Sequence, residues 1–244
     1  MSAILSLVET PDLLIRHLPG AGESLTVIFS SIGGEGEASH RDEFVGVGSE
    51  AGRNHVLFVT DRKRSWYSRP GLQQQVVETV LTFKDRSGSS DVVTLGNSMG
   101  GHGAMLFAKR LGARAAIAFA PQYSLSPAVL TENRWDHYRP HMTESLLADL
   151  GDWVDGSFLS YAIFGNQRRA DDQHMRRLTA LAGTAVWQVF GAGHSVARVL
   201  KERGKLAQSV RAMRDEAPDG VIGNLLGPKA KRLVPDVPQM TEGR

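Results

Sequence analysis

The chain contains no cysteine among its 244 residues, so no disulfide can form and the fold does not depend on the redox state of its compartment. No apolar run approaches the roughly 20 residues that a helix needs to cross a bilayer, and the N-terminus lacks the pattern of a secretion signal. The net charge is only +2 and the basic residues are scattered, which argues against a nucleic-acid partner. The histidines lack the spacing of a metal-binding motif. We therefore expect a cytoplasmic protein with no membrane span, nucleic-acid partner, metal or cofactor.

The order of apolar segments predicts the fold class. Short apolar runs suited to buried strands lie at 25–30, 55–60, 92–95, 115–119, 161–165 and 185–190, and a helix is predicted at about 72–85. Two short strands, 3–8 and 13–18, flank Pro11 and suggest an antiparallel hairpin at the sheet edge. Strands that alternate with helices predict an α/β fold, with a mostly parallel, doubly wound sheet and helices on both faces.

A serine in a Gly-x-Ser-x-Gly frame stands between a predicted strand and a predicted helix. Gly96, Ser98 and Gly100 form this frame. A strand-to-helix turn of this kind strains the serine backbone and requires small neighbours. It leaves the serine Oγ at a helix N-terminus, where the partial positive charge helps to hold an oxyanion. The context predicts a nucleophile at Ser98 rather than a glycine-rich helix start.

Two further candidates follow later strands. Asp171 and Asp172 stand in the polar loop after the run at 161–165, and His194 stands in a glycine-rich loop after the run at 185–190. Serine, then acid, then histidine is the chain order of the α/β-hydrolase triad. One nitrogen of His194 would take the serine proton while the other donates to a carboxylate. Either aspartate is also a good helix cap, so both remain candidates for the acid.

Three segments resemble the α/β-hydrolase superfamily, in particular small bacterial serine hydrolases of the esterase type: GNSMGGHGAMLFA, AIAFAPQYSLSP and FGAGHSV. The resemblance spans roughly residues 25–210 in element order and is specific near Ser98 and His194. It implies the α/β-hydrolase fold, a nucleophile at Ser98, a general base at His194 and an acid at Asp171 or Asp172.

The sequence departs from the family at its usual acid position. The place a few residues beyond the strand's terminal glycine carries no acid at 166–168, and the first acid is Asp171. We favour Asp171 because it forms the pattern D-x-x-H-x-x-x-L, common in the small relatives, with His174 and Leu178. Asp172 then serves as the N-cap of the next helix.

The resemblance also implies two donors for an oxyanion hole. One is the backbone N–H of Met99, directly after the nucleophile. The other is a backbone N–H in the turn that follows the strand at 25–30, where Ser31 and Ile32 are the candidates.

Two segments rich in aromatic residues are candidates for substrate binding. Residues 122–158 exceed a normal connection and form a possible small cap near the active site, in which Trp135 and Tyr138 are candidate contacts. Leu146, Leu147, Leu150 and Trp153 in the same segment predict an ordinary amphipathic helix.

The second aromatic segment, residues 61–67, joins three basic residues to Trp66 and Tyr67, and either grips the substrate or forms a solvated loop. His102, four residues after Ser98, is a further candidate contact. Both aromatic segments follow strands at the edge that carries Ser98, so we expect them to flank the entrance from opposite sides. The cleft between them would be shallow and suit a short acyl group on a polar carrier.

The predicted organisation is a hydrolase domain at 1–216 and an irregular tail at 217–244, which has four of the ten prolines. The first functional hypothesis is hydrolysis of a carboxylic ester or thioester through an acyl-serine intermediate. Acyl transfer or deacylation on a carbohydrate or another polar small molecule uses the same triad. The non-enzymatic alternative is a silent binding protein with this fold. The sequence makes no prediction about the oligomeric state.

Overall fold

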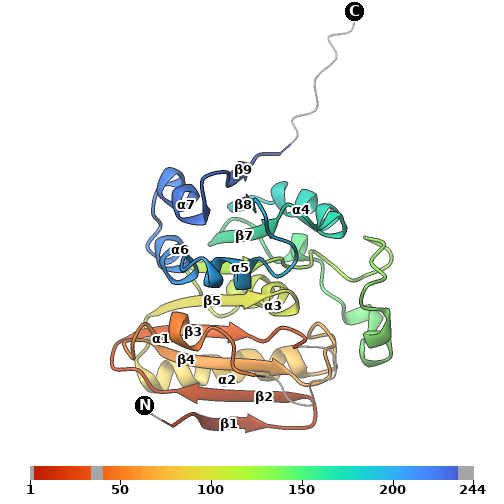
Figure 1. Ribbon diagram of the computed structural model, residues 1–244. Helices are drawn as coiled ribbons and strands as arrows, with labels where there is room; N and C mark the ends of the chain where they lie inside the picture. Colours follow the sequence, from red (N-terminus) through yellow and green to blue (C-terminus); the bar gives the residue numbers. More distant parts are fainter. Residues whose placement is uncertain (1–2, 34–40, 236–244) are drawn as a thin grey trace, which may run out of the picture.

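The computed structural model describes residues 3–33 and 41–235, and its centre is one nine-stranded sheet (Figure 1). The strand order is β1-β2-β4-β3-β5-β6-β7-β8-β9. The strands are β1 (Leu5–Glu9), β2 (Leu13–Leu18), β3 (Ser24–Phe29), β4 (His55–Asp61), β5 (Asp91–Asn97), β6 (Ala115–Phe119), β7 (Leu159–Gly165), β8 (Thr184–Val189) and β9 (Lys231–Leu233).

Pairing is parallel from β4 across to β8, whereas β1, β2 and β9 pair antiparallel at the two edges. The predicted hairpin at the first edge is present as β1 and β2. Because β5 and β6 lie in the middle and are covered on both faces, their residues are almost entirely buried, and those of β6 are all apolar. The structure confirms the predicted α/β-hydrolase fold.

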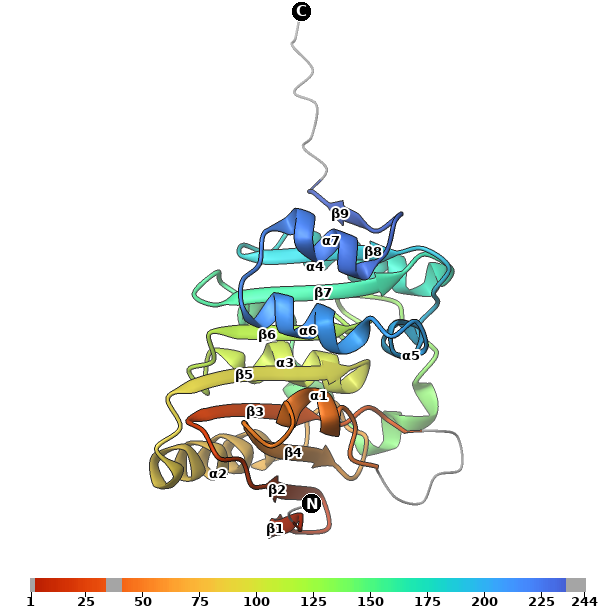
Figure 2. The same cartoon turned by 60° about the vertical axis from the view of Figure 1, so that its left-hand side comes forward.

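Helices cover both faces of the sheet, as Figures 1 and 2 show. One face carries α2 (Leu72–Ser87), α3 (Met99–Ala108) and α4 (Asp172–Thr179), and the other carries α1 (Val45–Ser49), α5 (Val196–Glu202), α6 (Leu206–Arg214) and α7 (Asp219–Leu226). Helix α3 packs against the sheet through a pair of stacked rings. The ring centroid of Phe107 lies 5.1 Å from that of Phe29 in β3. None of the helices within the described residues is long and apolar enough to cross a membrane.

The segment between β6 and β7 lies beside the carboxyl ends of the parallel strands (Figure 1). It contains three short 3₁₀ helices, η1 (Asp136–His141), η2 (Glu144–Leu146) and η3 (Leu150–Asp152). The prediction of an amphipathic helix from Leu146 to Trp153 was wrong. Leu147 and Asp149 have extended backbones that separate η2 from η3, and Leu150 instead donates its N–H to the Tyr123 carbonyl at 3.0 Å.

The tail is more regular than the sequence predicted. The expectation of an irregular segment from 217 onward was wrong for α7 and for β9, which pairs with β8. Gly223 lets α7 approach the Trp187 ring closely, and Ile222 and Leu226 are buried. An eight-residue helix and a three-residue strand are too short to show a clear apolar periodicity in the sequence. Their formation depends on tertiary packing against the rest of the fold. Residues 236–244 of the predicted tail lie outside the described residues.

Candidate active site

Ser98 stands on the sharp turn between β5 and α3. Its backbone has φ 55° and ψ −121°, a conformation that a residue with a side chain rarely adopts. A Cβ on Gly96 would collide with the Gly100 carbonyl, and a Cβ on Gly100 would collide with the Phe29 carbonyl. The two glycines of the motif are therefore required for the close approach of this turn to itself and to β3.

Ser98, His194 and Asp171 form one chain of hydrogen bonds. The Ser98 hydroxyl lies 2.9 Å from His194 Nε2, and His194 Nδ1 lies 3.1 and 3.0 Å from the two Asp171 carboxylate oxygens. Since an ionised carboxylate only accepts, Nδ1 carries the proton and Nε2 is free to accept from Ser98. Ser98 is 3% exposed and the His194 side chain is 21% exposed, so the imidazole is the more accessible of the two.

Asp171 has a second cationic neighbour. Arg134 of the β6–β7 segment donates from Nη1 to Asp171 Oδ1 at 2.7 Å. Burial raises the pKa of Asp171, but the hydrogen bonds and charges of His194 and Arg134 outweigh burial and lower the pKa below its usual value. The carboxylate is therefore ionised at neutral pH and suited to stabilise an imidazolium. Asp172 is the first residue of α4, and the N-cap position is held by Asp171, so the prediction that Asp172 caps this helix was wrong. His194 bonds to Asp171 and not to Asp172.

Arg134 also bonds a second buried carboxylate, Glu132. Arg134 Nε lies 2.9 and 3.0 Å from the two Glu132 oxygens, and His174 donates from Nε2 to Glu132 at 3.0 Å. The other nitrogen of His174 accepts from the Tyr123 backbone N–H at 3.1 Å, which fixes the ring. Burial alone would raise the pKa of Glu132, but the bonds from His174 and Arg134 lower it to about 2.

We expect Arg134→Met to destabilise the fold. The change leaves two buried carboxylates without their shared cation, and breaking a buried ion pair costs about 3 to 5 kcal/mol. The difference from wild type should shrink as the pH falls, because the stabilisation from Glu132 is present above its usual pKa of 4.5 and is lost as the pH drops toward about 2. Urea unfolding at a series of pH values measures both effects.

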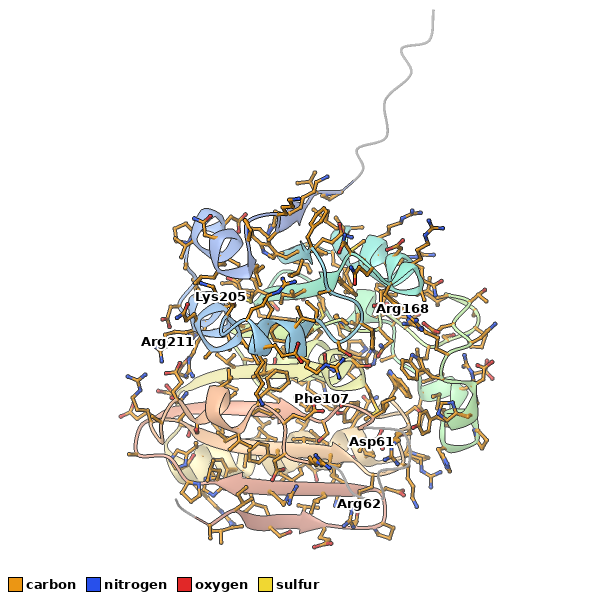
Figure 3. The ribbon with its side chains drawn as sticks, in the orientation of Figure 1. Asp61, Arg62, Phe107, Arg168, Lys205 and Arg211 are labelled. Carbon is orange, nitrogen blue, oxygen red and sulfur yellow. The ribbon has the colours of Figure 1, made fainter. Side chains whose placement is uncertain are left out.

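The control for this variant is Arg168→Met in the same region. Arg168, labelled in Figure 3, is exposed in the loop between β7 and η4 (Arg169–Asp171). A surface change of this kind stays within about 0.5 kcal/mol of wild type. An Arg134→Met curve that coincided with the control across the pH range would refute a stabilising role for the network.

The two predicted oxyanion donors differ in availability. Met99 is the first residue of α3, so its backbone N–H has no acceptor within the helix. The Ser31 N–H already donates to a Glu43 carboxylate oxygen at 3.2 Å, and the Ser31 hydroxyl donates to the other oxygen. Ile32 follows at the carboxyl end of β3 and is the better candidate for the second donor.

Three of the predicted substrate contacts are buried. Trp66 and Tyr67 have no exposed surface and His102 is 1% exposed. Tyr67 packs edge-on against the stacked rings of Phe29 and Phe107, 5.7 and 5.3 Å away. Direct contact of these three side chains with a substrate does not fit their placement, and they are better described as support beneath the site.

The other two predicted contacts, Trp135 and Tyr138, are half-buried near the site. The Trp135 ring lies 5.9 Å from the His194 ring and 5.8 Å from Trp66, and Tyr138 lies 6.2 Å from Trp66. The prediction that the two aromatic segments flank the entrance from opposite sides was therefore wrong, because they pack against each other.

Two of the three basic residues of the segment 61–67, Arg62 and Arg64, make side-chain contacts within the protein. Arg62 pairs with Glu9 of β1 at the sheet edge, where Figure 3 labels it, and Arg64 donates to the Ile32 carbonyl at 2.7 Å. The loop is organised by Asp61, which is fully buried and accepts from the backbone N–H groups of Ser65 and Tyr67. The sequence left two alternatives for this loop, substrate binding or a solvated loop. These contacts give no support to substrate binding.

Three polar residues of the site had no predicted role: Gln122, which contacts Ser98, Arg134, which contacts Asp171, and Glu132, which contacts Arg134 and His174. Gln122 carried a usable signal, because it follows β6 at the sheet edge that holds Ser98. Glu132 and Arg134 carried none, because they stand in an irregular segment. Within residues 3–33 and 41–235, no three histidine, aspartate or glutamate side chains are grouped so as to hold a metal ion.

Comparison with solved structures places the chain among α/β-hydrolase folds. A variant of the capsule O-acetyltransferase of Neisseria meningitidis serogroup A, in complex with CoA, is 15% identical with a TM-score of 0.60, covering 84% of this chain and 95% of that one. Est1E from Butyrivibrio proteoclasticus is 13% identical with a TM-score of 0.59, covering 88% of this chain and 100% of that one.

A third similar structure is a serine hydrolase without a lid from Xanthomonas campestris. It is 16% identical with a TM-score of 0.54, and the match covers 87% of this chain and 94% of that one. No protein-family model matches the sequence, and a search of curated proteins finds no match either. At these identities the likeness defines the fold alone: the chain is a protein of the α/β-hydrolase fold.

Proposed function

We propose that the protein is a serine hydrolase that cleaves a carboxylic ester or thioester, with Ser98 as nucleophile, His194 as general base and Asp171 as the acid of the triad. The observation that carries this proposal is the bonded chain from Ser98 Oγ through His194 to Asp171, with distances of 2.9 and 3.0 Å. Nucleophile, base and orienting carboxylate at these separations form the arrangement of nucleophilic serine catalysis.

The proposed reaction proceeds through an acyl-serine. The Ser98 proton passes to His194 Nε2 as Oγ bonds the carbonyl carbon, and the negative charge that forms on the carbonyl oxygen is held by the N–H groups of Met99 and Ile32. The imidazolium gives its proton to the leaving group as the ester bond breaks. Water, deprotonated by His194, then attacks the acyl carbon, releasing the carboxylic acid and the Ser98 hydroxyl.

Asp171 stabilises the imidazolium that forms in both half-reactions. Its bond to His194 Nδ1 also fixes the tautomer that leaves Nε2 ready to accept. Arg134 keeps the carboxylate ionised and oriented through the 2.7 Å bond to Oδ1. An O-acetyltransferase and a serine hydrolase among the similar structures are consistent with ester chemistry on this fold.

Transfer of the acyl group to a carbohydrate or another polar carrier is the second candidate. It is favoured by Trp135, which presents a half-buried ring 5.9 Å from the catalytic imidazole, where an acceptor would have to approach. Adding a sugar to an ester assay separates the two reactions, since a transferase forms a sugar ester in place of the free acid. Trp135→Ala would then weaken the apparent affinity for the sugar more than the rate with water.

We expect short esters to react faster than long ones. Ser98 is 3% exposed, and Met99 and Gln122 beside it are fully buried, so a long acyl chain gains little burial near the nucleophile. A methylene that fits a hydrophobic tunnel would instead gain roughly 1 to 3 kcal/mol. Rates on p-nitrophenyl esters should therefore fall from acetate to octanoate, and a clear optimum at the octanoate end would show that a long acyl chain is buried beside Ser98, contrary to this prediction.

A silent binding protein is the remaining alternative. It predicts no covalent reaction at Ser98, whereas the hydrolase proposal predicts labelling of Ser98 by a fluorophosphonate and turnover of p-nitrophenyl acetate. These two measurements on the folded protein separate the alternatives.

A further inference from the structure

Gln122 lies next to the nucleophile but belongs neither to the triad nor to the backbone oxyanion hole. It follows β6, two residues beyond Ala120, and its side chain is fully buried. Its Nε2 lies 3.3 Å from Ser98 Oγ, and its Oε1 lies 3.0 Å from Trp66 Nε1. A buried polar group needs a hydrogen-bond partner, and the partner of this amide is the oxygen of the proposed nucleophile. Its placement therefore indicates a function in the reaction.

The orientation of this amide follows from the chemistry of its neighbours. The indole nitrogen of Trp66 only donates, so it faces the amide oxygen, and the NH₂ group faces Ser98. The same NH₂ also lies 3.4 Å from the Ala120 carbonyl, which again only accepts. Two independent neighbours therefore assign the same orientation.

The backbone of Gln122 is held as firmly as its side chain. Its carbonyl lies 2.9 Å from His102 Nδ1. Burial lowers the pKa of His102 to about 4, so the ring is neutral at pH 7 and Nδ1 donates to that carbonyl. Trp66 and His102 thus fix the two ends of Gln122, which explains why both side chains are buried beneath the site.

We propose that Gln122 is a catalytic residue that donates an amide hydrogen bond to Ser98 Oγ. Because Oγ accepts from Gln122, its single proton is directed to His194 Nε2. As that proton moves to His194 and Oγ bonds the carbonyl carbon, the amide stabilises the negative charge that develops on Oγ. The amide itself gains and loses no proton. This inference rests on the proposed hydrolase function and adds a residue to it.

Two variants separate donation to Ser98 from anchoring by Trp66. Gln122→Met keeps the side-chain length and removes both bonds, whereas Trp66→Phe removes only the anchor and leaves the amide. For Gln122→Met we expect kcat on p-nitrophenyl acetate to fall about 10- to 100-fold with KM unchanged, as for the loss of one hydrogen bond to a charged group. Trp66→Phe should give a clearly smaller fall. Fluorophosphonate labelling of Ser98 should slow in parallel with kcat.

Equal losses in Gln122→Met and Trp66→Phe would overturn the proposal, because the effect would then come from the anchor alone. Wild-type kcat in Gln122→Met would overturn it as well. Should Gln122→Met fail to fold, Gln122→Glu keeps an acceptor for Trp66 and, when ionised, has no proton to donate. Its activity relative to wild type should fall as the pH rises, and a constant ratio would refute donation. Wild-type protein that neither labels nor turns over ester would instead refute the hydrolase proposal itself.

Discussion

Replacing Ser98 with alanine is expected to lower kcat on p-nitrophenyl acetate by about 10⁶-fold, the cost of removing the nucleophile from a serine triad. The reason is that His194 then has no hydroxyl to deprotonate and no acyl-enzyme can form. The Ser98 hydroxyl hydrogen-bonds to His194 and Gln122, and losing these two bonds should leave the fold intact. Steady-state kinetics and thermal unfolding of the purified variant measure the two expectations.

The matched control is Ser195→Ala. Ser195 precedes α5 next to His194, is exposed, and makes no side-chain hydrogen bond to the helix. We expect this variant to keep wild-type turnover. If Ser98→Ala retained wild-type rates on every ester, the activity would belong to another residue and Ser98 would have no catalytic role.

Asp171→Asn is expected to lower kcat by about 10⁴-fold, as in other triads whose acid is replaced by its amide. An amide at this position offers an N–H toward His194 Nδ1, which favours the wrong tautomer and no longer stabilises the imidazolium. The loss of charge beside Arg134 adds to the effect, since that cation is then paired with Glu132 alone.

Asp172→Asn provides the comparison. Asp172 is the first residue of α4, and replacement there should change turnover little, with a small cost in helix stability from the lost charge at the N-terminus. The opposite ranking of the two variants would transfer the acid's role to Asp172. Similar mild losses in both would mean that His194 is oriented by another group.

The fold was predictable because its signals are local. The strands from β3 to β8 are short apolar runs separated by turn residues, and each was predicted to within two residues of its ends. The elbow was predictable for a related reason, since Gly96 and Gly100 stand where no side chain fits. The structure places Ser98, Asp171 and His194 together beyond the carboxyl ends of β5, β7 and β8, three strands that the sequence predicts.

The parts that were mispredicted depend on contacts between distant residues. The segment from Leu146 to Trp153 has helical spacing, but the bond from Leu150 to the Tyr123 carbonyl and the extended Leu147 and Asp149 break it. The partners of the triad are equally non-local: Arg134 reaches Asp171 across 37 positions of the chain, and Gln122 reaches Ser98 across 24. Neither apolar periodicity nor a local motif in a single sequence can predict contacts between residues so far apart in the chain.

Covalent labelling tests the central claim most directly. The folded wild-type protein is treated with a fluorophosphonate, digested, and mapped by mass spectrometry, with Ser98→Ala treated in parallel. The proposed mechanism predicts one label per chain, located on Ser98, and loss of ester turnover in proportion to labelling. A folded protein that stays unlabelled while it turns over esters, or a label on another residue that abolishes turnover, would contradict the assignment of Ser98 as the nucleophile.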